Sequence, residues 1–178
     1  MYLAKPSDNI IGGVLVLHSW WGLNAFFRDL CDRLASKGFV ALAPDLYSGK
    51  VADTIPAAKR LRALSTANRK EPIYKFLIRE IGFLASHTAV RGPHIATLGY
   101  SMGGHWAFWL AQRPQLPITA TVTFYAARAG DFSATRSAFL CHLSPAVETW
   151  GRSISSSASR TGHFSHQNPL MDSILHAL

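Results

Sequence analysis

One segment of the sequence has the residue types and spacing that nucleophilic catalysis needs. It is the pentapeptide Gly99-Tyr-Ser-Met-Gly103, which follows an apolar run at 94–98 and leads into an apolar helical stretch. Where a strand turns sharply into a helix, glycines flank the serine because a Cβ there would collide with the neighbouring strand or helix. The pentapeptide is common by chance, but its position between a strand and a helix predicts Ser101 as the attacking group.

A serine hydroxyl also needs a base to take its proton and hydrogen-bond donors for the oxyanion that forms. The elbow geometry assigns the donors to two backbone amides. One is the N–H of Met102, at the start of the elbow helix, and the other is the N–H of Trp20, in the loop after the first long strand. We therefore expect these two segments to meet in space.

The elements that must position Ser101 alternate between strands and helices. Apolar runs without alternation are typical of strands buried on both faces of a parallel sheet, and helices show apolar residues at helical spacing. Strands are predicted at 13–18, 39–43, 94–98, 118–124 and 138–141, and helices at 24–37, 55–67, 72–87 and 102–112. This order predicts an α/β fold with a doubly wound, mostly parallel sheet, whose ligands bind beyond the carboxyl ends of the strands.

Length and composition indicate one domain. The chain has 178 residues, of which 48% are hydrophobic and 16% charged, which suffices for one core. The longest early apolar run is too short to cross a membrane and no signal-type segment is present, so we expect no membrane partner and a cytoplasmic location. Cys31 and Cys141 form neither a disulfide framework nor a metal-ligand spacing, so no metal is expected.

The formal net charge of +8 raises the question of polyanion binding. Much of the excess lies between Lys59 and Arg79 on predicted helices, with leucines between the charges and no stacking aromatic residues. This pattern is typical of solvated helix faces, and we expect no nucleic-acid partner. A weaker alternative is that some of these arginines steer an anionic substrate toward the site.

Three segments together resemble a known family. They are Leu15-Val-Leu-His-Ser-Trp-Trp-Gly-Leu-Asn24, Ala41-Leu-Ala-Pro-Asp-Leu-Tyr47 and Gly99-Tyr-Ser-Met-Gly-Gly104, and in order and spacing they are similar to the dienelactone hydrolase family of the α/β-hydrolase fold. The resemblance implies hydrolysis of a small ester or lactone by a nucleophile, a histidine base and an acid, without a metal or organic cofactor. The best-known member has a cysteine at the elbow and a glutamate on the first loop, where this sequence has Ser101 and Ser19.

The first loop also supplies candidates for substrate contact, Ser19 and Trp21. With Trp20, Trp21 could form an aromatic wall of an acyl pocket, and core packing under the sheet edge is an equal alternative. His18 ends a strand near the site, but the chain order of α/β-hydrolases places the base last, so we expect it to bond the loop backbone. His105 is expected to be a packing or surface residue.

Asp45 is expected to brace the turn after the second strand. The triad acid and base should follow the strand at 138–141. Glu148 is the acid predicted from its position, and Thr161-Gly-His163-Phe is similar to the family's Gly-His-aromatic motif, so His163 is the predicted base, with His166 and His176 as alternatives. His163 comes sooner after Glu148 than an intervening helix and strand would allow.

The last part of the sequence changes in character. Serine dominates 151–160 and no periodicity survives there, so we predict a hydrolase core at 1–143 and an irregular tail at 144–178. The sheet would then lack the last strand and helix of the α/β-hydrolase type, through truncation, an altered reading frame or remodelling. Two functions remain open: a serine-dependent hydrolase of small esters or lactones, and a catalytically inactive protein of this fold that binds a ligand or partner. The sequence does not indicate the oligomeric state.

Overall fold

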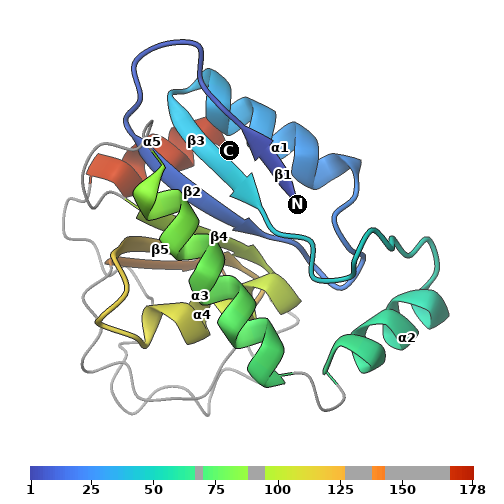
Figure 1. Ribbon diagram of the computed structural model, residues 1–178. Coiled ribbons are helices and arrows are strands. Elements are labelled where there is room, and N and C mark those ends of the chain that lie inside the picture. Colours follow the sequence, from blue (N-terminus) through green and yellow to red (C-terminus); the bar gives the residue numbers. More distant parts are fainter. Residues whose placement is uncertain (67–69, 88–94, 127–137, 143–168) are drawn as a thin grey trace.

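In a computed structural model, the described part of the chain forms a six-stranded sheet covered by helices on both faces (Figure 1). The structure describes residues 1–66, 70–87, 95–126, 138–142 and 169–178. The strands are β1 (Tyr2–Ala4), β2 (Gly12–Leu17), β3 (Phe39–Ala43), β4 (Ile95–Tyr100), β5 (Ile118–Phe124) and β6 (Ala138–His142). The helices are α1 (Ala25–Ser36), α2 (Ile55–Thr66), α3 (Lys70–Ser86), α4 (Met102–Ala111) and α5 (Pro169–Ala177).

The strand order is β1-β3-β2-β4-β5-β6, and every neighbouring pair except β1 and β3 is parallel. The predicted doubly wound, mostly parallel sheet is confirmed. Strand β1, which pairs antiparallel with β3 at the sheet edge, is not predicted from the sequence because three residues show no periodicity. The carboxyl ends of β2, β3, β4 and β5 meet at one edge of the sheet, which places the loops after them together.

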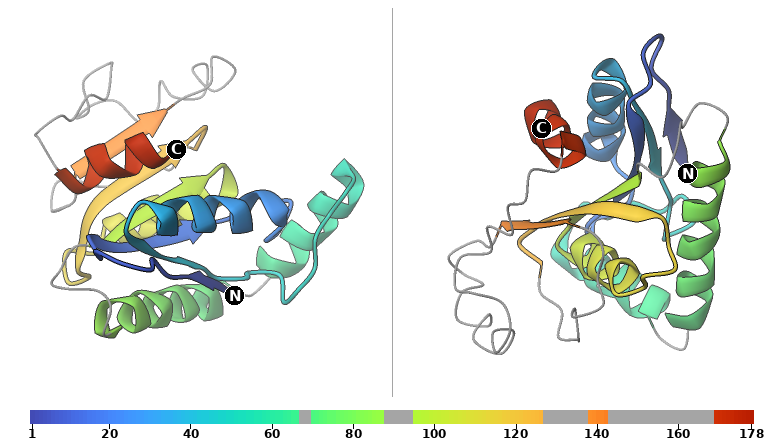
Figure 2. Two further views of the ribbon diagram at one scale, coloured as in Figure 1. Left: turned by 90° about the horizontal axis from the view of Figure 1, so that it is seen from above. Right: turned by 90° about the vertical axis from the view of Figure 1, so that its left-hand side faces the viewer.

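The unbroken apolar runs have a direct structural cause, because alternate residues of one strand enter different cores. Val14 and Val16 of β2 pack with α1 and α5, whereas Leu15 and Leu17 pack with α3 and α4. The two views of Figure 2 show these helix pairs on opposite sides of the sheet, with α2 standing apart from it. Both sides of each central strand are therefore buried.

Helix α1 ends as the sequence predicts. Gly38 adopts a φ of 93°, and its N–H donates to the carbonyl of Ala35 at 3.0 Å. A Cβ at Gly38 would lie 2.6 Å from the backbone oxygen of Asn9, so a left-handed conformation and a close approach both require glycine here. This turn sends the chain directly into β3.

The end of the chain forms a helix, which the sequence analysis did not predict. Helix α5 places Ile174 and Ala177 in the core beside α1, and the guanidinium of Arg33 donates to the carbonyl oxygen of Leu178 at 3.2 Å. Residues 169–177 of the tail expected at 144–178 are thus helical, whereas 143–168, which include the serine-rich segment, lie outside the described residues. Among the described residues no strand follows β6.

The packing of α5 can be tested by truncating its most buried side chain. Ile174→Ala should lower the free energy of unfolding by about 2–5 kcal/mol, because Ile174 has no exposed surface and the change leaves a cavity. Leu175→Ala is the matched control, since 38% of that neighbouring side chain is exposed, and it should cost about 0.5 kcal/mol or less. Equal values from urea unfolding would contradict the docking of α5 on α1.

Candidate active site

Ser101 lies at a sharp bend between β4 and α4. Its φ of 52° and ψ of −112° are outside the regions that L-residues normally adopt, so the bend is strained. The N–H of Ser101 donates to the carbonyl of Phe124 at 2.9 Å, and its own carbonyl accepts from the N–H of His105 at 3.1 Å. The structure thus holds a half-buried serine at the tight turn that the sequence predicts, although β4 continues to Tyr100, past the predicted end at 98.

The glycines around Ser101 allow backbone segments to touch. A Cβ at Gly99 would lie 2.5 Å from the backbone oxygen of Gly103, and a Cβ at Gly103 would overlap the carbonyl groups of Leu17 and His18. Gly104 similarly lies against Ala126. The first turn of α4 therefore packs directly on the end of β2, as the glycine spacing indicates.

The loop after β2 lies at the same edge of the sheet. Ser19 is buried, with its Oγ 3.5 Å from the N–H of Trp21, and the Gly22 N–H donates to the Ser19 carbonyl at 3.2 Å. Trp20 and Trp21 are half-buried, their rings meet edge to face at 5.5 Å, and neither belongs to the two cores. Both tryptophans thus lie at the rim of the sheet, outside its packed interior.

The two backbone amides singled out in the sequence have no acceptor among the residues that the structure describes. In the part of the chain that the structure describes, neither the N–H of Trp20 nor that of Met102 donates to another protein group. For Met102 this follows from its place in the first turn of α4, where N–H groups have no intrahelical acceptor. The contact between Gly103 and the carbonyl of His18 brings the two segments together.

His18 is buried and both of its ring nitrogens are occupied. Nδ1 lies 2.6 Å from the carbonyl oxygen of Ser19, and Nε2 accepts from the N–H of Leu46 at 3.1 Å, so Nδ1 carries the proton of a neutral ring. Burial lowers the pKa of His18, against the smaller opposing effects of the Ser19 hydrogen bond and the Asp45 charge. The predicted role in bonding the loop backbone is confirmed, and this ring is unable to accept a proton from Ser101 without losing a bond.

The loop after β3 is braced by Asp45, as predicted. Its carboxylate accepts from the N–H of Tyr47 at 2.9 Å and from the N–H of Gly49 at 2.5 Å. The hydroxyl of buried Tyr47 donates to the sulfur of Met102 at 3.3 Å, and its ring lies edge to face with His18 at 5.1 Å. This role of Tyr47 is not predicted from the sequence, where the only signal is its position beside a turn in Pro-Asp-Leu-Tyr.

The predicted acid and base fall outside the described residues, since Glu148, His163 and His166 all lie within 143–168. His176, the other alternative base, is exposed near the end of α5, two residues before Leu178, whose carbonyl oxygen accepts from Arg33 of α1. His105 packs edge to face on Trp106 at 5.3 Å, as expected of a packing residue. Among the described residues no hydrogen bond joins the Ser101 hydroxyl to a histidine.

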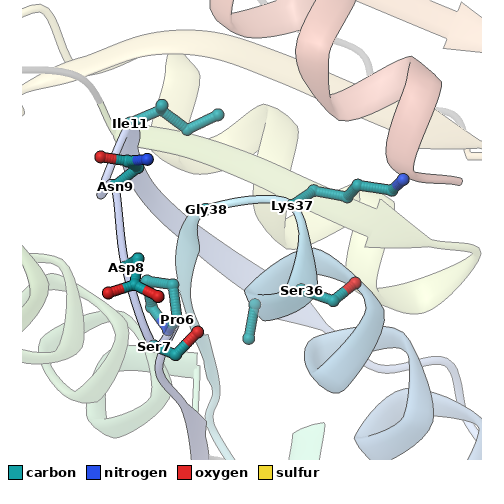
Figure 3. Close-up of a pocket in the computed structure, with 9 residues that line it drawn as sticks. Pro6, Ser7, Asp8, Asn9, Ile11, Ser36, Lys37 and Gly38 are labelled. Carbon is teal, nitrogen blue, oxygen red and sulfur yellow. The ribbon is translucent and has the colours of Figure 1, made fainter.

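A cavity of about 340 Å³ opens elsewhere in the molecule, between residues 6–11 and the end of α1 (Figure 3). It is lined by Asp8, Asn9, Lys37 and Gly38 among others, and it faces the amino ends of β2 and β3. It is therefore separate from the elbow, at the opposite edge of the sheet. The described residues include no cluster of three or more metal-ligating side chains and no helix long and apolar enough to span a membrane.

Comparisons with known proteins agree with this arrangement. The sequence model of the dienelactone hydrolase family matches residues 1–139. The chain is 34% identical over 116 residues to the protein usf of Aquifex pyrophilus, covering 64% of this chain and 50% of that protein. It is 30% identical over 115 residues to an Aquifex aeolicus protein assigned as a carboxymethylenebutenolidase, covering 63% and 50%. The chain thus spans about half the length of these relatives.

A solved structure shares the fold. The structure of a Klebsiella pneumoniae protein assigned as a dienelactone hydrolase superposes with a TM-score of 0.63 at 22% identity, covering 84% of this chain and 71% of that one. At this level of identity the likeness supports the α/β-hydrolase type of sheet.

The buried neutral state of His18 predicts a pH-dependent stability. Because the folded protein binds a proton at His18 less readily than the unfolded chain, the stabilisation should be complete above the ordinary histidine pKa of ~6.5 and decrease as the pH falls toward the lowered value. The temperature of the thermal unfolding midpoint should therefore decrease when the pH is lowered from 7.5 to 5.5. The decrease should be smaller in His18→Asn, which has no titrating group at this position. An equal fall in both proteins would show that His18 is not held neutral.

Proposed function

Because this chain belongs to the dienelactone hydrolase family, we propose that it is a serine-dependent hydrolase of small esters or lactones. The observation that carries the proposal is the strained bend at Ser101, at the carboxyl end of β4 and beside two backbone amides that have no acceptor in the described part of the chain. A non-glycine residue with positive φ is unfavourable, and such strain is characteristic of sites where the fold aims a reactive side chain.

In this proposal Ser101 attacks the acyl carbonyl carbon and a histidine takes the hydroxyl proton. The resulting tetrahedral intermediate expels the alcohol, which receives the proton back, and leaves an acyl group on Ser101; for a lactone the alcohol remains part of the same molecule. Water, activated by the same histidine, then releases the acid and restores the hydroxyl. His163 is the base that we propose, oriented by Glu148, on the motif and position of these residues in the sequence.

The oxyanion would be bound by the N–H groups of Trp20 and Met102. Their support is the contact of Gly103 with the end of β2, together with the absence of another acceptor for either amide among the described residues. Main-chain donors at fixed positions are effective because they need no reorganisation when charge develops, and one such donor typically contributes about 100- to 1,000-fold in rate.

The substrate class follows from the family and from the rim of the site. One relative carries a name that refers to a butenolide, which is a lactone, and this is the class that we propose here. Half-buried Trp20 and Trp21 offer an apolar surface next to the proposed donors, and the buried Ser19 precedes them with its Oγ 3.5 Å from the Trp21 N–H. We propose that these residues contact the acyl part of a small substrate.

The nucleophile can be tested with p-nitrophenyl acetate. Ser101→Ala should lower kcat/KM by about 10,000-fold or to the uncatalysed rate, because no acyl group can then be transferred to the protein. Ser86→Ala is the matched control, since its exposed hydroxyl bonds the carbonyl of Phe83 at the far end of α3, and it should leave the rate unchanged. Full activity in Ser101→Ala would refute the proposal.

The base is tested by His163→Ala beside His166→Ala. If His163 accepts the serine proton, only the first change should abolish the reaction, and a loss in His166→Ala alone would move the role to that residue. If the unaltered protein shows no turnover and no acylation of Ser101 by an activated ester, the alternative of an inactive ligand-binding protein would stand instead.

A further inference from the structure

We propose that His18 and Tyr47 are positioning residues that form one hydrogen-bonded bridge between the two oxyanion donors. The bridge runs from the peptide preceding Trp20, through the His18 ring and the loop after β3, to Met102. This inference rests on the proposed function, because it assigns the bridge the task of holding those two amides at a set separation.

The first link orients the Trp20 amide. The carbonyl of Ser19 and the N–H of Trp20 belong to the same planar trans peptide, so they point in opposite directions. The carbonyl is held by His18 at 2.6 Å and by the N–H of Gly22 at 3.2 Å. With the carbonyl fixed on one side, the N–H points to the other side, where it has no acceptor among the described residues and could meet a substrate oxygen.

The second link ties this peptide to the loop after β3. Nε2 of His18 accepts from the N–H of Leu46, so one side chain bonds the backbones of two loops. The ring has no exposed surface and is enclosed by Phe27 and Tyr47, at 6.2 Å and 5.1 Å between ring centroids. Water is therefore unable to replace either bond, and the ring must stay neutral to keep both.

The third link reaches the other donor. Asp45 holds the turn through the N–H groups of Tyr47 and Gly49, which fixes the position from which the Tyr47 side chain extends. The Tyr47 hydroxyl then donates to the sulfur of Met102 at 3.3 Å. Since sulfur is a weak acceptor, this link should contribute less than the two bonds of His18.

A bridge of this kind acts on the transition state more than on substrate binding. Oxyanion donors interact most strongly when charge develops on the carbonyl oxygen, so a misplaced donor lowers kcat and leaves KM nearly unchanged. A purely structural role would instead reduce the amount of folded protein, with unchanged kcat per folded molecule. The division between kcat and KM therefore separates the two roles.

The experiment compares kcat and KM of folded His18→Phe, His18→Asn and Tyr47→Phe on p-nitrophenyl acetate. His18→Phe keeps an aromatic ring but loses both bonds, and its kcat should fall about 10- to 100-fold. His18→Asn can still donate to the Ser19 carbonyl, so it should recover part of that loss. Tyr47→Phe removes one weak hydrogen bond and should lower kcat about 2- to 10-fold.

The controls are matched in chemistry and lie away from the bridge. His87→Phe, after the end of α3, and Tyr2→Phe, whose hydroxyl bonds Asp32 on α1 at 2.8 Å, should keep kcat within about twofold. Unchanged kcat in folded His18→Phe or His18→Asn would overturn the proposal. A rise in KM with constant kcat would do the same.

A second measurement does not depend on activity or on the folding of variants. Nitrogen-15 NMR of the unaltered protein should show His18 as the tautomer protonated at Nδ1 and accepting at Nε2, at pH 7. The opposite tautomer, or a charged ring, would overturn the bridge even if hydrolysis is observed. If Ser101-dependent hydrolysis is absent while this tautomer is present, the proposed function fails, and with it the catalytic role of the bridge, whereas the loop contacts stand.

Discussion

The site depends on one close approach, that of the first turn of α4 to the main-chain carbonyls at the end of β2. No side chain separates them, since a Cβ at Gly103 would overlap the carbonyl groups of Leu17 and His18. This contact places the start of a helix, whose first N–H groups have no intrahelical acceptor, directly beside the loop that contains Trp20. The sheet supports the arrangement because β2 and β4 are neighbouring parallel strands whose carboxyl ends lie together (Figure 1).

The loops around this contact are held by hydrogen bonds of polar side chains, one of which is fully buried. His18 is inside the protein although it is titratable, and it is tolerated there because each ring nitrogen has a backbone partner. Asp45, which is closer to solvent, also holds a loop, because its carboxylate accepts hydrogen bonds from two backbone N–H groups of its own turn. Side-chain to main-chain bonds of this kind satisfy backbone groups that have no partner in a helix or sheet.

The sequence predicts the parallel sheet well because its central strands are buried on both faces. Leu15 and Val16, which are neighbours in β2, enter different cores, so the apolar run is unbroken. The bend at Ser101 could be predicted because close backbone contacts around it require glycine, and this requirement gives a short local sequence pattern. Helix α5 was not, since its stability comes from packing Ile174 against α1, a contact between distant parts of the chain. The link from Tyr47 to Met102 was also hidden, because a bond between residues so far apart leaves no periodic pattern. For Glu148 and His163, which lie outside the described residues, the sequence predictions remain untested.

The conformation of Ser101 has a thermodynamic consequence for the rest of the molecule. A serine with φ of 52° is less stable than it would be in an ordinary strand or helix, by about 1–3 kcal/mol, and a glycine would adopt that angle without penalty. The residue kept at the bend is thus one that opposes folding. The strand pairs and the two layers of helices must therefore contribute enough stabilising free energy to hold this residue in an unfavourable backbone conformation.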